Sequence, residues 1–276
     1  MFEKTLPYRI FFWASLILIG LFVIFPLYWM VNTALKSPME VLSPHLWPEN
    51  PTLKNFIGVF HNEEIITYFK NSFIVSTVTS ILATFVAAYA AYSFSKYRYK
   101  GRMSFMLLIL VSKMFPYAVL LLSIYLMMQT LGMQDSYTAL VISYITFALP
   151  VACWTLKTYF DEIPDALIES AKIDGASNWG IIHKIIFPLT VPGLIATAIY
   201  SFVWSWNDVL YSLTLITSTD KRTLGAGLIM TYIGEGNDDW AGMMAASVLV
   251  SIPVSVIFIF VQRYFVQGLT AGAVKG

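Results

Sequence analysis

The chain has 276 residues, of which 58% are hydrophobic and only 12% are charged, and its formal net charge is +1. A soluble domain carries roughly 25% charged residues, so this composition excludes an ordinary soluble domain and indicates a membrane protein. The near-zero net charge gives no excess of basic residues that would suggest nucleic-acid binding. The single cysteine, Cys153, lies in an apolar run, which excludes a disulfide framework and a cysteine metal site.

Six apolar segments are long enough to cross a bilayer, which takes about 20 residues. They predict an all-α polytopic membrane protein with spans over residues 10–34, 70–95, 103–128, 137–158, 189–216 and 243–265. The first segment is too long for a signal peptide and has no cleavage site of small residues, so we expect it to stay as a spanning helix. Prolines within the spans are expected to kink them: Pro26, Pro116, Pro150, Pro192 and Pro253.

The distribution of basic residues predicts the orientation of these spans. An even number of spans places both termini on one side, and cytoplasmic loops are enriched in lysine and arginine. If the termini are inside, the outer segments hold only Lys36, Lys54, Lys221 and Arg222. The inner segments then hold Lys4, Arg9, Lys96, Arg98, Lys100, Arg102, Lys157, Lys172, Lys184, Arg263 and Lys275. Both termini are therefore predicted to be cytoplasmic, together with the segment between the fourth and fifth spans.

That segment contains the polar stretch ESAKIDGASNWGIIHKIIFP, Glu169 to Pro188. Pro164 suits the first turn of a helix that can run to about Asp174. Gly175 can then adopt the left-handed conformation of a helix C-cap, and Ser177 can cap a second helix that ends before Pro188.

The first of these helices is predicted to dock on another protein. Ala166, Ser170 and Ala171 are small and cluster on one side, and a small-faced helix can lie deep in a groove of a partner. A plain linker is the alternative, but helix connections are usually about 2 to 8 residues and this one is much longer.

The same residues resemble a known signature. Glu-Ser-Ala at 169–171, then three residues, Gly175, then nine residues and Ile-Ile-Phe-Pro at 185–188 resemble the Glu-Ala-Ala signature of permease subunits in binding-protein-dependent ABC importers. The spacing fits without a gap, with Ser170 in place of alanine and Phe187 in place of leucine. SFVWSWNDVL (201–210) and QGLTAGAVKG (267–276) resemble the carbohydrate branch of that family, which includes the maltose importer.

The resemblance implies a type I ABC importer permease in the plasma (inner) membrane, which is not an enzyme. Its implied partners are a second homologous permease, two ATP-binding subunits that carry ATP and Mg, an extracytoplasmic substrate-binding protein, membrane lipid and a sugar. This chain itself has no Gly-rich phosphate loop and no implied cofactor or metal. We expect residues 1–69 to form the first span and outer loop, 70–265 the transmembrane domain with coupling helices at about 161–188, and 266–276 a cytoplasmic tail.

Two groups of residues are candidates for contact with the ATP-binding subunits. The resemblance implies that the helix containing Glu169, Ser170, Ala171, Asp174 and Gly175 is the coupling helix seated in a cleft of the ATPase. It also implies that the tail reaches the ATPase dimer, through Gly268, Leu269, Thr270 and Lys275. A frayed terminus is the alternative for the tail.

A candidate substrate pathway comes from polar and aromatic residues inside the spans. Polar groups in a membrane are costly and usually face a cavity or a partner, so Asn207 and Asp208 are predicted to point inward. Aromatic rings beside amides and carboxylates suit a sugar. The candidates are Lys113, Tyr117, Trp204, Trp206, Asn207 and Asp208. Asn207 as a cap of a helix break, and Lys113 paired with Asp208 or extended toward water, are the structural alternatives.

The outer segment from Thr217 to Gly242 resembles the loop that helps release sugar from the binding protein. Its candidate contacts are Tyr232, Asn237, Asp238, Asp239 and Trp240, and a solvated connector is the alternative. A glycerol-phosphate-type importer remains open as the function. A secondary transporter is less favoured because the chain shows no internal repeat. A third alternative, a membrane anchor or assembly factor, predicts that charge changes at Glu169 and Asp174 leave solute uptake intact.

Overall fold

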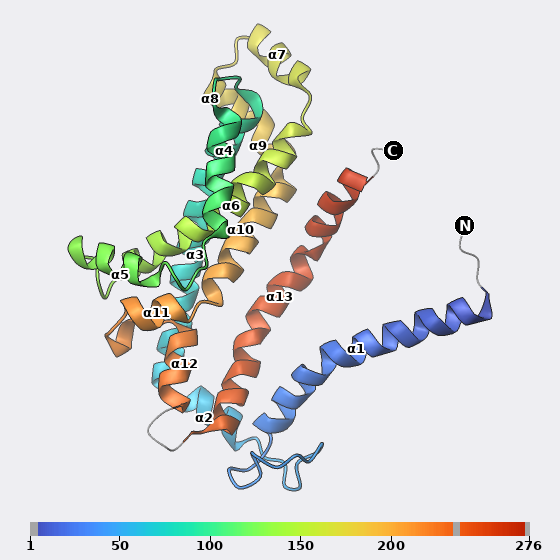
Figure 1. The fold of residues 1–276 in the computed structure, drawn as a ribbon, viewed down its shortest axis with the longest axis vertical. Coiled ribbons are helices and arrows are strands. Elements are labelled where there is room, and N and C mark those ends of the chain that lie inside the picture. The colour runs from blue at the N-terminus through green and yellow to red at the C-terminus, as the bar shows by residue number, and fades with distance from the viewer. Residues whose placement is uncertain (1–4, 234–237, 274–276) are drawn as a thin grey trace. The chain divides into compact units, whose positions relative to one another are not determined.

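The computed structural model describes residues 5–233 and 238–273, and all regular structure within them is helical (Figure 1). The chain divides into two compact units, Met1–Ile65 with Leu228–Pro253 and Ile66–Gly227 with Val254–Gly276. The predicted division at residues 70 and 266 stays a prediction.

The first unit contains α1 (Leu6–Ala34) and α2 (Lys54–His61). Helix α1 is apolar on all sides, as a lipid-facing span requires. The loop between the two helices is tied back to the end of α1. The amide Nδ2 of Asn55 donates to the carbonyls of Ala34 (2.8 Å) and Lys36 (3.0 Å), and the Lys36 ammonium donates to the Ser43 carbonyl at 2.7 Å.

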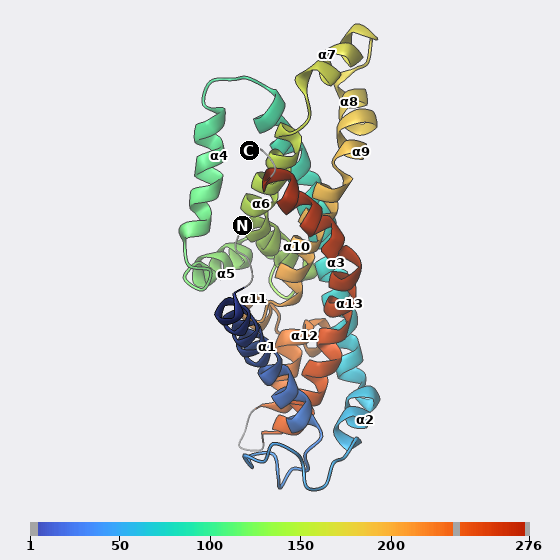
Figure 2. The same cartoon turned by 90° about the vertical axis from the view of Figure 1, so that its right-hand side faces the viewer.

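The second unit is built on three helices that lie side by side in both views (Figures 1 and 2). These are α3 (Glu63–Lys96), α6 (Tyr137–Asp161) and α10 (Val191–Trp206). Small residues line their contacts, among them Ala87, Ala88 and Ala91 of α3 and Ala152 and Cys153 of α6. Small side chains let helix backbones approach closely, which is how helices associate in lipid.

Four of the six predicted spans are continuous helices among the described residues. The predicted third span is interrupted: α4 (Arg102–Val111) and the 3₁₀ turn η1 (Ser112–Met114) are separated from α5 (Leu121–Thr130) by a non-helical stretch. Pro116 explains the interruption, because it has no N–H to donate and drives Phe115 into extended backbone, with φ −72° and ψ 128°.

The predicted fifth span is interrupted as well. Helix α10 ends at Trp206, and α11 (Leu210–Leu215) begins after a break at Asn207–Val209. At its other end α10 meets the preceding helical stretch Asn178–Leu189 at a bend of 81°. The described residues therefore contain four uninterrupted apolar helices long enough to span a membrane, or five if the bent pair is counted as one span.

The remaining helices connect these elements. The segment after α6 forms α7 (Asp165–Ile173), α8 (Asn178–Ile181), a π-helical turn η2 (Ile182–Ile186) and α9 (Phe187–Leu189). After α11 come η3 (Thr219–Lys221), α12 (Leu224–Tyr232) and α13 (Trp240–Ala273). Within the second unit, α7 and α8 lie at one end, and α5 and α11 lie toward the other (Figures 1 and 2).

Candidate functional site

The predicted docking segment folds as two helices joined by a sharp turn. Gly175 follows α7 with φ +80°, in the left-handed region. Its N–H donates to the Lys172 carbonyl (3.1 Å), and the N–H of Ala176 donates to the Ala171 carbonyl (2.9 Å). These two bonds form a Schellman motif, the C-cap that glycine favours. Ser177 caps α8 by accepting a hydrogen bond from the Gly180 N–H at 3.1 Å, so both predicted caps are confirmed.

The two faces of α7 differ in what they contact. Ile168 and Ala171 are buried in the core of the unit. Glu169, Ser170, Asp174 and the 86% exposed Ile173 face outward. The small face predicted for docking is therefore only partly free, because Ala171 packs inside the chain. The outward face combines carboxylates with an apolar side chain.

The N-terminal end of α7 is bound to the C-terminal end of α3. The Lys96 ammonium donates to the Asp165 carboxylate (2.9 Å) and to the Ile163 carbonyl (2.6 Å). The hydrogen bond and the charge of Lys96 hold the pKa of Asp165 below its usual range. This contact orients α7 relative to the spanning helices.

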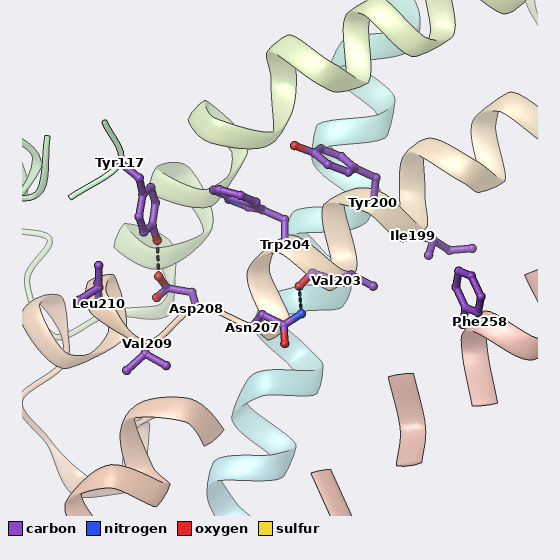
Figure 3. Close-up of a pocket in the computed structure, with 10 residues that line it drawn as sticks. All are labelled: Tyr117, Ile199, Tyr200, Val203, Trp204, Asn207, Asp208, Val209, Leu210 and Phe258. Atoms are coloured by element: carbon purple, nitrogen blue, oxygen red, sulfur yellow. Dashed lines mark hydrogen bonds between the residues drawn. The ribbon is translucent and has the colours of Figure 1, made fainter. Parts of the chain in front are cut away.

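A cavity of about 540 Å³ lies beside the break between α10 and α11 (Figure 3). Four predicted pathway residues line it: Tyr117, Trp204, Asn207 and Asp208. Tyr200, one turn before Trp204 on α10, adds a further aromatic ring with a polar end. The wall is mainly apolar, with a few polar groups converging on it, as in small-molecule sites.

The other two predicted pathway residues do not line this cavity. The ammonium of Lys113 lies 4.1 Å from the centroid of the Trp204 ring in a cation–π contact. Among the described residues, the ion pairs include none between Lys113 and Asp208. Trp206 is buried and packs instead against Phe202 and Phe69, with ring centroids 5.5 and 5.4 Å away.

The two polar residues at the break both cap helices. Asn207 donates from Nδ2 to the Val203 carbonyl at 2.8 Å and so caps the end of α10, the structural alternative weighed for it. Asp208 is buried and accepts from the backbone N–H groups of Tyr211 (3.4 Å) and Ser212 (3.1 Å) at the start of α11. It also accepts from the hydroxyls of Tyr117 and Tyr144, the latter at 2.6 Å.

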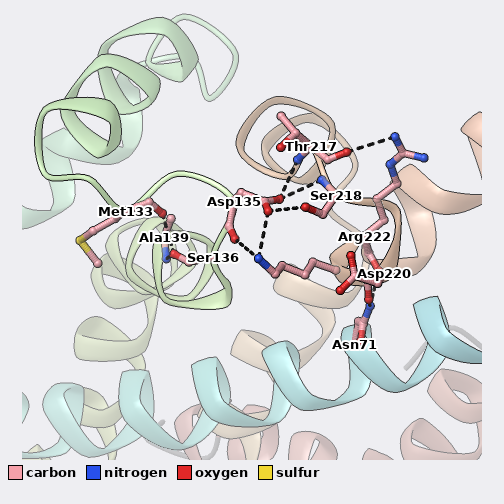
Figure 4. Close-up of polar contacts among 10 residues, drawn as sticks. Asn71, Met133, Asp135, Ser136, Ala139, Thr217, Ser218, Asp220 and Arg222 are labelled. Atoms are coloured by element: carbon pink, nitrogen blue, oxygen red, sulfur yellow. Dashed lines mark hydrogen bonds and ion pairs between the residues drawn. The ribbon is translucent and has the colours of Figure 1, made fainter.

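A second polar cluster joins the α5–α6 turn to the segment after α11 (Figure 4). Asp135 accepts from the N–H groups of Thr217 (3.0 Å) and Ser218 (2.9 Å), from the Ser218 hydroxyl and from the Lys221 ammonium (2.9 Å). The hydrogen bonds from Ser218, and then those from Lys221 and Thr217, hold the pKa of Asp135 well below its usual range. Its contribution to stability is therefore complete above the unfolded-state pKa of about 3.9 and is lost only in stronger acid.

The same region is bound to α3 through Asn71. Its Nδ2 donates to the carbonyls of Asp220 and Arg222, both at 2.8 Å. Its Oδ1 accepts from the Tyr137 hydroxyl at 2.7 Å. Asn71 thus holds the segment that leads into α12 at two carbonyls and is itself held by Tyr137.

The candidate binding-protein residues are described in part. Tyr232 ends α12, and its carbonyl accepts from the Asp239 N–H at 2.9 Å. Burial, and then the nearby Asp239 carboxylate, raise the pKa of Tyr232 to about 12. Asp239 in turn accepts from the Gly242 N–H at 2.8 Å and caps α13, which begins at Trp240. Asp238 precedes this cap in the chain, and Asn237 lies outside the described residues.

Three of the four predicted ATPase contacts at the C-terminus fall on α13. The helix continues past the expected end of the span at residue 265, so Gly268, Leu269 and Thr270 are helical. Lys275 lies outside the described residues.

Sequence reasoning did not single out Tyr144, Tyr200 or Asp135. Tyr144 and Tyr200 lie in apolar runs where a tyrosine is common. Nothing in their spacing predicts that they approach the break at Asn207–Val209, which we call the Asp208 turn. Asp135 carried a weak signal, since an acidic residue three positions after Gly132 indicates a turn.

A comparison with known protein families identifies the family of this chain. Residues 80–271 match the model of the binding-protein-dependent transport system inner membrane component. The chain belongs to this family.

Curated members of the family match the chain over nearly its full length. It is 36% identical to the inner membrane ABC transporter permease protein YcjP of Escherichia coli, with 99% of each chain covered. It is 32% identical to the trehalose/maltose transport system permease protein MalG of Thermococcus litoralis, with 100% of each covered.

A solved structure gives the same fold. A chain from the crystal structure of a bacterial ABC transporter that imports the acidic polysaccharide alginate superposes with a TM-score of 0.80. The match covers 96% of this chain and all of that one, at 22% identity. The family member described here thus has the all-helical fold of a type I ABC importer permease.

Proposed function

We propose that the chain is a permease subunit of an ATP-driven importer of oligosaccharides or disaccharides. The observation that carries the proposal is the match to the Thermococcus litoralis trehalose/maltose permease over the whole of both chains. Similarity that extends over all of both matched chains favours the same role for both. The helix after the fourth span then faces the cytoplasm, with both termini on that side.

The chemistry of the cavity supports a sugar as the solute. The rings of Tyr117, Tyr200 and Trp204 offer faces on which the C–H groups of a pyranose can stack. The indole Nε1–H of Trp204 is buried and has no hydrogen-bond partner in the described part of the chain. Asn207 is exposed, and its side-chain amide oxygen can accept a hydrogen bond from a sugar hydroxyl.

The fold of α7 to α9 supports the coupling role. A helix whose outward face carries Glu169, Asp174 and Ile173 suits a cleft that is basic at its rim and apolar at its base. Because Lys96 fixes α7 to α3, and α9 leads directly into α10, motion of a docked ATPase would reach two spanning helices. Two such ATPase subunits would supply ATP and Mg, and a second permease would complete the pathway.

Co-purification tests the whole proposal. The tagged chain is extracted from its native membrane in mild detergent, and the proteins retained with it are identified by mass spectrometry. We expect a second permease and a P-loop ATPase. The recovered complex, reconstituted with its binding protein, should hydrolyse ATP faster with a disaccharide or oligosaccharide than with glycerol 3-phosphate. Recovery of the chain alone, with uptake driven by an ion gradient, would instead support a secondary carrier.

The contact between Lys113 and Trp204 leads to a prediction about transport. Replacing Lys113 with methionine keeps a long flexible side chain but removes the charge over the indole, a contact worth about 0.5 to 2 kcal/mol. Solute uptake should fall about threefold to tenfold, because the ring loses the contact that fixes its face toward the cavity. Assembly, judged by the amount of ATPase retained, should stay normal. Uptake at the wild-type rate would contradict the assignment of Lys113 to the pathway.

A further inference from the structure

The two interrupted spans meet at one carboxylate. Tyr117 belongs to the break between η1 and α5, and Asp208 belongs to the break between α10 and α11. Asp208 accepts from the Tyr117 hydroxyl, and the Tyr211 hydroxyl at the start of α11 donates back to the Tyr117 carbonyl at 3.2 Å. Tyr144, on the uninterrupted α6, donates to the same carboxylate at 2.6 Å. Both breaks are thus bound to each other and to the continuous helix α6.

The bonding capacity of this carboxylate is filled by the protein. A carboxylate has about four acceptor sites, two on each oxygen. Oδ1 accepts from the Tyr144 hydroxyl and the Ser212 N–H, and Oδ2 accepts from the Tyr117 hydroxyl and the Tyr211 N–H. The side chain is also buried, with 6% of its surface exposed. A sugar hydroxyl would have to displace one of these donors, so a solute contact is a poor explanation for Asp208.

The turn is also bound to the segment that leads into α12. The Ser212 hydroxyl accepts from the N–H and the hydroxyl of Thr223, at 3.3 and 2.6 Å. The next N–H, of Leu224, donates to Ser72 of α3 at 2.7 Å. Gly225 lies so close that a Cβ there would be 2.9 Å from the Asp208 carbonyl oxygen. Movement of this segment therefore reaches the Asp208 turn through direct contacts.

The other end of α10, away from Asp208, is joined to the proposed coupling segment. Helix α10 runs from Val191, just after the 81° bend below α9, to Trp206, two residues before Asp208. Helix α10 is continuous between these two ends, so a displacement at one end can be carried to the other. The coupling helices would displace α10 at one end. Asp208, at the other end, would pass this displacement to the two breaks that border the cavity.

We infer that Asp208 is a positioning residue that locks the two helix breaks together, and that this lock couples ATP hydrolysis to opening of the solute pathway. The inference rests on the proposed function and extends it. The carboxylate acts through Tyr117, Tyr144 and the start of α11, and it does not bind the solute. If the hydrogen bonds to Asp208 are weakened, the coupling helices can move without a matching movement of the residues around the cavity.

The test uses the complete importer in proteoliposomes, with the solute identified for the wild-type complex. Three variants are compared: Asp208→Asn, Tyr144→Phe and Tyr200→Phe. Each of the last two variants removes one tyrosine hydroxyl. Tyr144 is fully buried against Asp208, whereas Tyr200 lines the cavity. For each variant we would measure solute uptake, its KM, ATP hydrolysis with and without the binding protein, and the thermal midpoint of the complex.

We expect Asp208→Asn to lower the number of solutes imported per ATP by about fivefold or more, the usual size of a coupling effect. Tyr144→Phe should lower the same ratio to a smaller degree, and both should keep the wild-type KM. Tyr200→Phe should change KM and leave the ratio intact.

Two results would overturn the inference. A raised KM in Asp208→Asn with a normal Tyr144→Phe would make Asp208 a solute contact. A lowered thermal midpoint with an unchanged ratio of uptake to ATP hydrolysis would make its role purely structural. A wild-type complex whose ATP hydrolysis ignores the solute would refute the proposed function itself, and this inference with it.

Discussion

Replacing Gly175 with alanine is expected to lower solute uptake about tenfold. The residue has φ +80°, and a Cβ built on it meets no atom within 4 Å, so the cost arises from the backbone alone. The left-handed conformation costs a non-glycine residue roughly 1 to 2 kcal/mol, and 1.4 kcal/mol is a tenfold change in an equilibrium. The helix–turn–helix would then sample arrangements in which α7 and α8 no longer present one docking surface. Uptake in membrane vesicles and retention of the ATPase would measure the effect.

Gly132 provides a matched control for this substitution. It follows α5 with φ +66°, and its Cβ position is also open. Its N–H donates to the Gln129 carbonyl at 3.0 Å, and the Met133 N–H donates to the Met128 carbonyl at 2.9 Å, which is again a Schellman motif. Gly132→Ala should therefore destabilise the protein to a similar extent without loss of the ATPase. Equal losses of ATPase retention in both variants would show that Gly175 matters only for stability.

The parts of the fold that follow from local chemistry could be predicted from the sequence. Long apolar runs gave the four continuous spans, because about 20 apolar residues in a row have few stable alternatives to a membrane helix. Gly175 and Ser177 gave the caps of the docking segment, because a glycine C-cap and a serine N-cap each satisfy backbone groups within a few residues. Such signals need no knowledge of distant parts of the chain.

The two helix breaks were harder to predict. Pro116 carried a signal, but prolines occur within membrane helices that stay continuous, as Pro26 and Pro150 do here. No proline lies at the second break, where Asp208 is stabilised by hydroxyls from residues 91 and 64 positions earlier in the chain. A tertiary network of this kind overrides helix propensity and leaves no periodic pattern to read.

The candidate pathway shows the same limit. Trp204 and Trp206 are two positions apart on one helix, so they point to different sides of it. The sequence alone does not say which side faces a cavity, and the structure assigns Trp204 to the cavity and Trp206 to the core. Asp208 is buried, and the donors to its carboxylate are protein groups.

Gly225→Ala is expected to destabilise the folded protein by about 1 to 3 kcal/mol, the usual cost of overpacking a core. The added methyl group would lie 2.8 Å from a Val209 methyl carbon and 2.9 Å from the Asp208 carbonyl oxygen. The valine can rotate, but the carbonyl is part of the backbone and moves only if the Asp208 turn moves. Because that turn joins α10 to α11, the start of α11 must shift and weaken its bonds to the carboxylate. The thermal midpoint of the purified protein in detergent would fall by several degrees.

Gly58→Ala is the control that separates the effect of the close contact at Gly225 from the effect of an added methyl group alone. Gly58 lies within α2, and a Cβ there meets no atom within 4 Å. Alanine is favoured over glycine inside a helix by about 1 kcal/mol, so this variant should be as stable as wild type or more so. If Gly225→Ala behaved like Gly58→Ala, α12 would have room to move away from the Asp208 turn. The close packing of these two segments would then not be needed to hold the break in place.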